Sequence, residues 1–165
     1  MATRRINILN FATLPDTSGN VWFEPAALTQ TNDRYPQMVA RFKDTATKDS
    51  LGIRFPVPDN YVGSPVMEVI WTSTATTGNV IWVIDYNSGS KTATLDPSTD
   101  EESPTVTTAA PGTSQTGVAS RMTLTAANLA ANDIFQGKVS RNGAGSDTMA
   151  ADAVVYNIIF EYVDV

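Results

Sequence analysis

The residue types that carry most enzyme chemistry are missing from this chain. Its 165 residues include no cysteine and no histidine. Catalytic triads that use histidine, cysteine–histidine pairs, histidine-ligated metals and cysteine-ligated zinc are therefore excluded. Carboxylates remain, and Glu68 and Asp85 are the candidates for a glycosidase pair. Such a pair needs a set separation within one cleft. We interpret both as salt-bridge residues, and we expect no catalytic residue, metal or cofactor.

A second group of carboxylates occupies a stretch rich in proline, serine and threonine. A calcium or magnesium site needs several oxygens that converge on one point, and the spacing here does not match an EF-hand loop. We therefore expect a solvated loop. The group comprises Asp96, Asp100, Glu101 and Glu102.

Three tryptophans could stack on sugar rings. Trp71 and Trp82 fall on the apolar faces of their predicted strands, so packing in the core is the simpler interpretation. Trp22 lies in the N-terminal stretch and is a weaker candidate for the core.

Strands must position these side chains. Residues 66–87 hold two apolar runs around a Ser/Thr/Gly turn, a pattern typical of a long antiparallel hairpin. The second run, residues 80–86, is apolar on both faces. One face can fill the core, whereas Ile81 and Val83 on the other face need a separate apolar partner.

Short runs rich in β-branched and aromatic residues recur between turn signals, and helical periodicity is nearly absent. This pattern predicts an all-β protein, an eight-stranded jelly-roll β-sandwich with an extended N-terminal arm. Single helical turns are expected at residues 24–28 and 126–131. The predicted strands are residues 37–43, 50–56, 66–72, 79–86, 105–109, 118–125, 133–141 and 153–163.

Residues 1–35 look irregular but contain several aromatic residues, which disordered segments lack. We predict an ordered N-terminal arm over residues 1–35 and a jelly-roll domain over residues 36–165. Residues 1–54 carry seven Lys/Arg and five Asp/Glu (net +2), and residues 55–165 carry four and twelve (net −8). Ordinary surface variation explains this asymmetry most simply. The sharper hypothesis is that the arm docks on an acidic neighbour through Arg4, Arg5, Phe11, Trp22 and Phe23.

Several apolar residues interrupt the polar sides of their predicted strands. A large apolar patch on a protein surface usually marks an interface. One hypothesis is a contact between copies of the chain, and the other is that an arm or helix of the same chain covers these residues. They are Ile70, Ile81, Val83, Val155 and Ile159.

A loop rich in glycine precedes the last predicted strand. Its sequence, RNGAGSDTMAAD, occupies residues 141–152 and is typical of a long hairpin loop. We expect Asp147 and Asp152 to cap turns through hydrogen bonds from the backbone.

Two stretches of the chain resemble jelly-roll domains in virion proteins of tailed bacteriophages. The first is FPVPDNYVGSPVMEVIWTSTATTGNVIWVIDY at residues 55–86, and the second spans residues 109–162 and includes the glycine-rich loop. The likeness covers roughly residues 42–162. It is carried by Phe55, Pro58, Tyr61, Gly63, Trp71, Thr72, Ser73, Ala75, Thr76, Gly78, Val80, Trp82, Arg141, Asp147, Thr148, Ala150, Asp152 and Ala153.

This resemblance implies a non-enzymatic homotrimer that decorates or cements a phage capsid. Its partners would be its own copies and the major capsid protein or another virion protein. Such a protein would be made in the host cytoplasm and lie on the outer surface of the particle. The alternative is a receptor- or glycan-binding module of a head or tail fibre, which predicts aromatic and polar side chains in an exposed cleft.

Two classes of partner are not expected. The net charge is −6, whereas nucleic-acid binders usually carry a basic stripe. No apolar run reaches the length of a membrane span.

Overall fold

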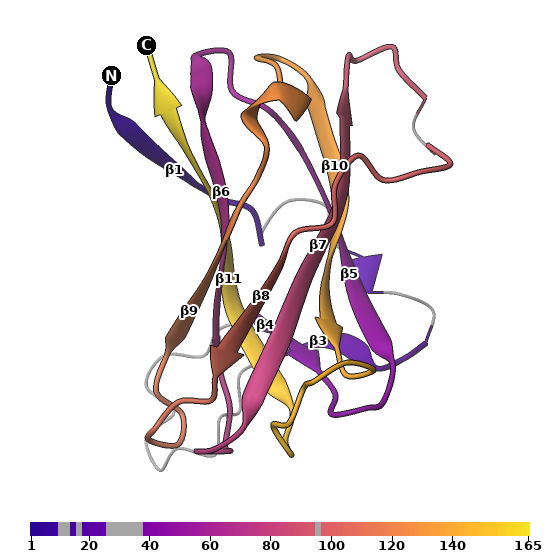
Figure 1. The fold of residues 1–165 in the computed structure, drawn as a ribbon, viewed down its shortest axis with the longest axis vertical. Helices are drawn as coiled ribbons and strands as arrows, with labels where there is room; N and C mark the ends of the chain where they lie inside the picture. The colour runs from indigo at the N-terminus through magenta and orange to yellow at the C-terminus, as the bar shows by residue number, and fades with distance from the viewer. Residues whose placement is uncertain (10–13, 16–17, 26–37, 95–96) are drawn as a thin grey trace.

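A computed structural model describes residues 1–9, 14–15, 18–25, 38–94 and 97–165. These residues form two antiparallel sheets that face each other across one core (Figure 1). Sheet A comprises β1 (Thr3–Asn7), β3 (Val21–Pro25), β4 (Met38–Phe42), β6 (Tyr61–Thr72), β9 (Val118–Thr123) and β11 (Ala153–Asp164). Sheet B comprises β2 (Leu14–Pro15), β5 (Lys48–Pro56), β7 (Asn79–Gly89), β8 (Thr105–Ala109) and β10 (Ile134–Asn142).

The predicted jelly-roll β-sandwich is confirmed. All eight predicted strands are present as β4 to β11, in the orders β4-β11-β6-β9 and β5-β10-β7-β8. This order is the double Greek key of a jelly roll, in which most connections cross from one sheet to the other. A 3₁₀ turn at Ala126–Asn128 (η1) lies within the predicted helical turn at residues 126–131.

Alternating apolar residues of both sheets form the core. Trp71 of β6 and Trp82 of β7 are fully buried and meet edge-to-face, with ring centroids 5.9 Å apart. Further along the sandwich, Phe135 stacks against both Phe55 and Tyr86. Both strand tryptophans therefore stabilise the core, as their alternation predicts.

The hairpin predicted for residues 66–87 is wrong. β6 pairs with β11 and β9 in sheet A, whereas β7 pairs with β10 and β8 in sheet B. The connection at residues 73–78 crosses between the sheets, so Trp71 and Trp82 meet through the core. The glycine-rich loop also links opposite sheets, β10 and β11, so it is not a hairpin loop either. Residues of both sheets share one core, and periodicity alone cannot separate this arrangement from a hairpin.

The assignment of Val155 to the outer face of its strand requires correction. Val155 pairs with Trp71 and Asn157 pairs with Ile70, so Tyr156 is an extra residue at a β-bulge. A bulge reverses the alternation of side chains on either side of it. Val155 consequently lies in the core with 0% exposure.

The described parts of residues 1–35 contribute strands to both sheets. β1 pairs with the C-terminal half of β11, β3 pairs with β4, and β2 pairs with β5. Phe11, a predicted docking residue, lies outside the described residues. So do residues 26–28 of the helical turn predicted at residues 24–28, whereas Glu24 and Pro25 form the end of β3. No helix in the described part of the chain is long and apolar enough to cross a membrane.

Candidate functional site: the outer face of sheet B

One half of the outer face of sheet B is closed by its own chain. The Lys48 ammonium on β5 reaches across β10 to the Asp85 carboxylate on β7, with Nζ and Oδ2 2.5 Å apart. Val83 and Ser140 lie opposite each other on this half and are both buried. The loop after β10 approaches Ile81 at Gly145. This half is consequently not available to a ligand.

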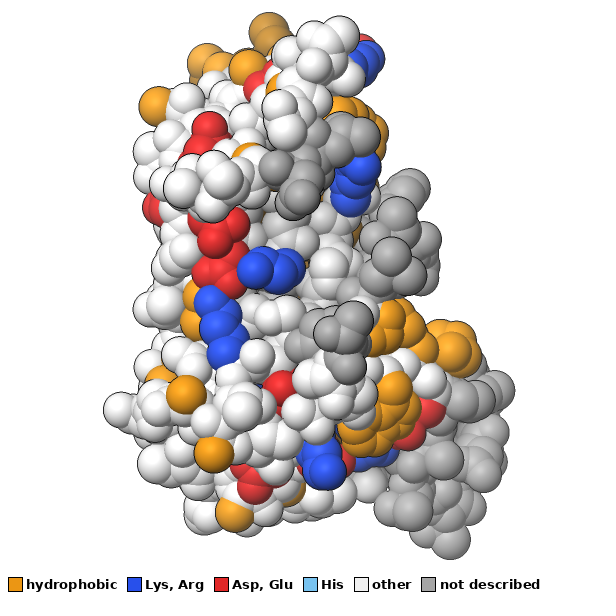
Figure 2. All heavy atoms as spheres, turned by 90° about the vertical axis from the view of Figure 1, so that its right-hand side faces the viewer, with side chains coloured by type: hydrophobic (Ala, Val, Ile, Leu, Met, Phe, Trp, Pro, Cys, Tyr) orange, Lys and Arg blue, Asp and Glu red, His pale blue; other side chains and the backbone are white. Residues whose placement is uncertain are grey.

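The other half carries polar side chains in register across three strands. Gln136 on β10 lies opposite Arg54 on β5 and opposite Asn87 on β7. Lys138 lies two residues further along β10, on the same face. We call Arg54, Asn87, Gln136 and Lys138, together with the loop at residues 89–94, the sheet B platform. Figure 2 shows the side of the molecule on which sheet B lies, with charged side chains interspersed among neutral ones.

A small depression lies at the edge of the platform. It is lined by Asn87, Gly89, Ser90, Ala93, Thr94, Ile134 and Gln136. Its volume is about 10 Å³, which holds about one water molecule. A ligand would therefore lie across the platform, because the depression is too small to enclose it.

The two platform amides are only loosely held. Asn87 Nδ2 donates to Thr99 O and Gln136 Nε2 donates to Thr94 O, each at 3.4 Å. These distances exceed the usual 2.7–3.2 Å range, so the bonds are weak. An amide offers two donors and an acceptor and can therefore exchange such contacts for those of a hydroxyl-bearing ligand. Platform residues of this kind were not singled out from the sequence, although Gln136 and Lys138 alternate with the buried Phe135 and Val139.

Trp22 lies apart from the platform, on sheet A. Its Nε1 donates to Glu24 Oε2 at 2.8 Å, and Arg41 Nε donates to Glu24 Oε1 at 2.6 Å. The hydrogen bond from Arg41 lowers the pKa of Glu24. The Arg41 guanidinium carbon lies 6.0 Å from the Trp22 ring centroid, a cation–π distance. This half-buried tryptophan is thus held by contacts within its own chain.

The two carboxylates considered as a glycosidase pair lie on opposite outer faces of the sandwich. Glu68 on β6 forms ion pairs with Arg5 and Arg121, and Asp85 on β7 pairs with Lys48. The whole core separates them, so they cannot act on one bond. Their interpretation as salt-bridge residues is confirmed.

Two of the described acidic residues around position 100 have local partners, whereas Asp100 is exposed. Glu101 accepts a hydrogen bond from Ser88 N, and Glu102 accepts from Tyr86 Oη at 2.5 Å and from Thr125 N. Burial favours the protonated form of Glu102, but the bonds from Tyr86 and Thr125 outweigh it and lower its pKa. Burial raises the pKa of Tyr86. Asp96 lies outside the described residues, and in the described part of the chain no three carboxylates converge as a metal site.

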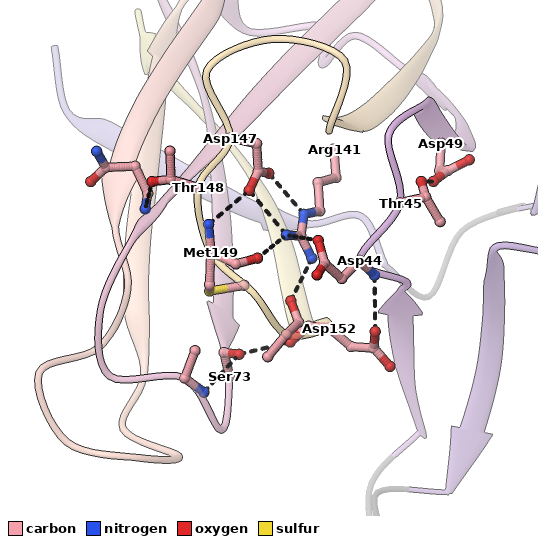
Figure 3. Close-up of polar contacts among 12 residues, drawn as sticks. Asp44, Thr45, Asp49, Ser73, Arg141, Asp147, Thr148, Met149 and Asp152 are labelled. Carbon is pink, nitrogen blue, oxygen red and sulfur yellow. Dashed lines mark hydrogen bonds and ion pairs between the residues drawn. The ribbon is translucent and has the colours of Figure 1, made fainter.

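Arg141 organises the glycine-rich loop (Figure 3). Its guanidinium is buried and binds Asp147 through two hydrogen bonds of 2.8 and 3.0 Å. It also donates to the backbone carbonyls of Ala151 and Met149 at 2.6 and 2.7 Å. As predicted, Asp147 caps a local turn by accepting the backbone N–H of Met149. Asp152 instead accepts the backbone N–H of Asp44, which is distant in the sequence, so its predicted turn-capping role is wrong. This cluster fixes the end of the sandwich, and every charge in it has a partner.

The five residues of the predicted oligomer interface are not brought together. Ile81 and Val83 lie on the outer face of sheet B, and Ile70 and Ile159 lie on that of sheet A. Val155 lies in the core.

The predicted docking arm is bound to its own sandwich at each described residue. Arg4 pairs with Asp164 at 2.6 Å, Arg5 pairs with Glu68 and Glu161, and Phe23 packs against the core.

Comparison with known proteins shows the fold. No family model and no curated protein matches the sequence. The carbohydrate-binding module CBM35 from Paenibacillus barcinonensis superposes with a TM-score of 0.53 and 11% identity, over 95% of this chain and 97% of the module. An isomalto-dextranase from Arthrobacter globiformis T6, complexed with panose, gives a TM-score of 0.56 and 14% identity, over 96% of this chain and 23% of the enzyme. The chain therefore has the size of the module and about a quarter of the length of the enzyme.

These identities show a shared fold and not a shared ligand. The jelly-roll part of the resemblance drawn from the sequence agrees with these neighbours, and none of the neighbours described is a virion protein.

Proposed function

We propose that this protein is a non-enzymatic glycan-binding module that binds its ligand on the sheet B platform. The observation that carries the proposal is the row Arg54–Gln136–Asn87, in which three polar side chains line up across three strands beside a shallow depression. Glycan hydroxyls both donate and accept hydrogen bonds, as amides do. The fold shared with a carbohydrate-binding module supports the same class of ligand.

The shape of the platform favours an extended oligosaccharide over a small enclosed ligand. Neighbouring strands lie about 4.8 Å apart, so a row across three strands spans roughly 10 Å. The described platform residues include no aromatic side chain, so affinity depends on hydrogen bonds. If four side chains contribute about 1 kcal/mol each, the dissociation constant is on the order of 1 mM. Several copies of such a module would be needed for tight binding.

This proposal is preferred over capsid decoration because the predicted oligomer interface does not form one patch. Its residues are divided between two opposite faces and the core. A place in a phage head or tail fibre, as the resemblance implies, is compatible with a glycan-binding module and remains part of the proposal. Catalysis is not proposed, because Glu68 and Asp85 lie on opposite faces and each is bound by cations.

Affinity electrophoresis through gels that contain a panel of neutral and charged polysaccharides tests the proposal. We expect retardation by at least one polysaccharide, and we expect the double variant Asn87→Ala/Gln136→Ala to lose it. Thr123→Ala serves as the control, because Thr123 is exposed on sheet A. Failure of the folded protein to bind any glycan would refute the proposal. Equal retardation of the double variant would refute the platform as the site.

A further inference from the structure

We infer that the glycan bound by the sheet B platform is anionic and carries carboxylate or sulfate groups. This inference rests on the proposed function and narrows its ligand class. It starts from the distribution of unpaired cations. Most described Lys and Arg side chains form ion pairs, including Arg4, Arg5, Arg41, Lys48, Arg121 and Arg141.

Two platform residues depart from this pattern. Arg54 and Lys138 are exposed, and the structure gives neither of them an ion-pair partner among the described residues. They are diagonal neighbours on β5 and β10, because Arg54 lies opposite Gln136 and Lys138 follows two residues later. Lys91, which is also exposed and has no ion-pair partner in the described part of the chain, belongs to the loop of the platform. The platform thus carries three cations without an ion-pair partner among the described residues, although the protein as a whole has a net charge of −6.

The acidic residue directly opposite Lys138 on the same face is already bound by another cation. Asp85 lies opposite Lys138 but is buried, and its carboxylate accepts the Lys48 ammonium at 2.5 Å. Lys138 and Arg54 therefore remain available to an external anion.

The neighbouring amides complete an arrangement suited to an acidic sugar. A guanidinium presents a planar fork of donors that matches a carboxylate or sulfate group. Gln136, directly beside Arg54, and Asn87, next in the row, can bind the hydroxyls of the same or the adjacent sugar ring. Arg54 would bind the anionic group, Lys138 would contribute a second charge, and the amides would recognise the ring.

Because these cations are exposed, their attraction to a ligand is screened by salt. The test is isothermal titration calorimetry of the full chain with an oligosaccharide of uronic acid, its carboxyl-reduced neutral counterpart and a sulfated oligosaccharide, at low and high salt. We expect binding of at least one anionic ligand that is at least tenfold tighter than binding of the neutral one. We also expect high salt to weaken it.

The variants Arg54→Gln and Lys138→Gln should each weaken anion binding at least threefold. Lys43→Gln should leave anion binding unchanged. Lys43 is exposed and forms no ion pair with any residue that the structure describes, but it follows β4 of sheet A. Preference for the uronate or for the sulfated ligand identifies which anion the platform uses, and either result supports the inference. Equal binding of the neutral and both anionic ligands would overturn the inference and leave the glycan-binding proposal standing. Absence of binding to all three ligands and to the polysaccharide panel would overturn both.

Discussion

Replacement of Arg141 by methionine should destabilise the protein far more than replacement of any surface arginine. The Arg141 side chain is 1% exposed, and its partner Asp147 is 3% exposed. Methionine fills similar space but donates no hydrogen bond, so Asp147 would remain as a buried, unpaired carboxylate. The carbonyls of Ala151 and Met149 would lose their donors as well. Breaking a buried ion pair from one side costs about 3–5 kcal/mol.

This cost can be measured by urea unfolding with tryptophan fluorescence, which reports on the buried Trp71 and Trp82. With a denaturant slope of about 2 kcal/mol per molar urea, a loss of about 4 kcal/mol lowers the unfolding midpoint by about 2 M. A double-mutant cycle with Asp147→Asn should give a coupling free energy of about 1–3 kcal/mol, because the two residues share two hydrogen bonds.

Arg121→Met is the matched control. Arg121 also binds two carboxylates, those of Glu68 and Glu161, but its side chain is 44% exposed. Exposed ion pairs contribute about 0–1 kcal/mol. If Arg141→Met and Arg121→Met lower stability equally, the burial argument is refuted, and the glycine-rich loop must be held by other contacts.

Two further predictions concern pH and backbone geometry. The pKa of Glu161 is lowered by its hydrogen bond from Arg121, so its contribution to stability is present above its ordinary value of 4.5 and is lost as pH falls through the lowered value. We expect Glu161→Gln to flatten the decline in stability below about pH 4.5, measured by urea unfolding, and an unchanged acid profile would contradict this. Gly78 has φ of +92°, and an added Cβ would lie 2.5 Å from Thr148 O, so Gly78→Ala should cost about 1–3 kcal/mol. In thermal unfolding, Gly117→Ala should be nearly neutral because nothing lies within 4 Å of its added Cβ, and equal effects would refute the strain argument.

Much of the fold could be predicted from the sequence because alternation reports which residues are buried. The apolar stripes of residues 66–72 and 79–86 located β6 and β7, and alternation in residues 50–56, 118–125 and 153–163 located β5, β9 and β11. Burial patterns do not say which strands pair. β6 and β7 therefore looked like a hairpin, although they lie in opposite sheets. Likewise, the bulge at Tyr156 inserts one residue and moves Val155 into the core.

The candidate site was outside the reach of sequence reasoning for a related reason. Arg54, Asn87 and Gln136 belong to three strands that are far apart in the chain, and only their pairing in sheet B aligns them. The residues that drew attention in the sequence, such as Arg141 and the strand tryptophans, are largely buried and stabilise the fold.

Composition and periodicity by themselves determined that this chain is all-β, lacks histidine and cysteine chemistry, and buries Trp71 and Trp82. These properties depend on residue types and on the two-residue repeat of a strand, both of which are local. Tertiary structure decided which strands pair, which cations remain unpaired and where polar side chains converge. Those properties depend on contacts between distant segments, and no local pattern encodes them.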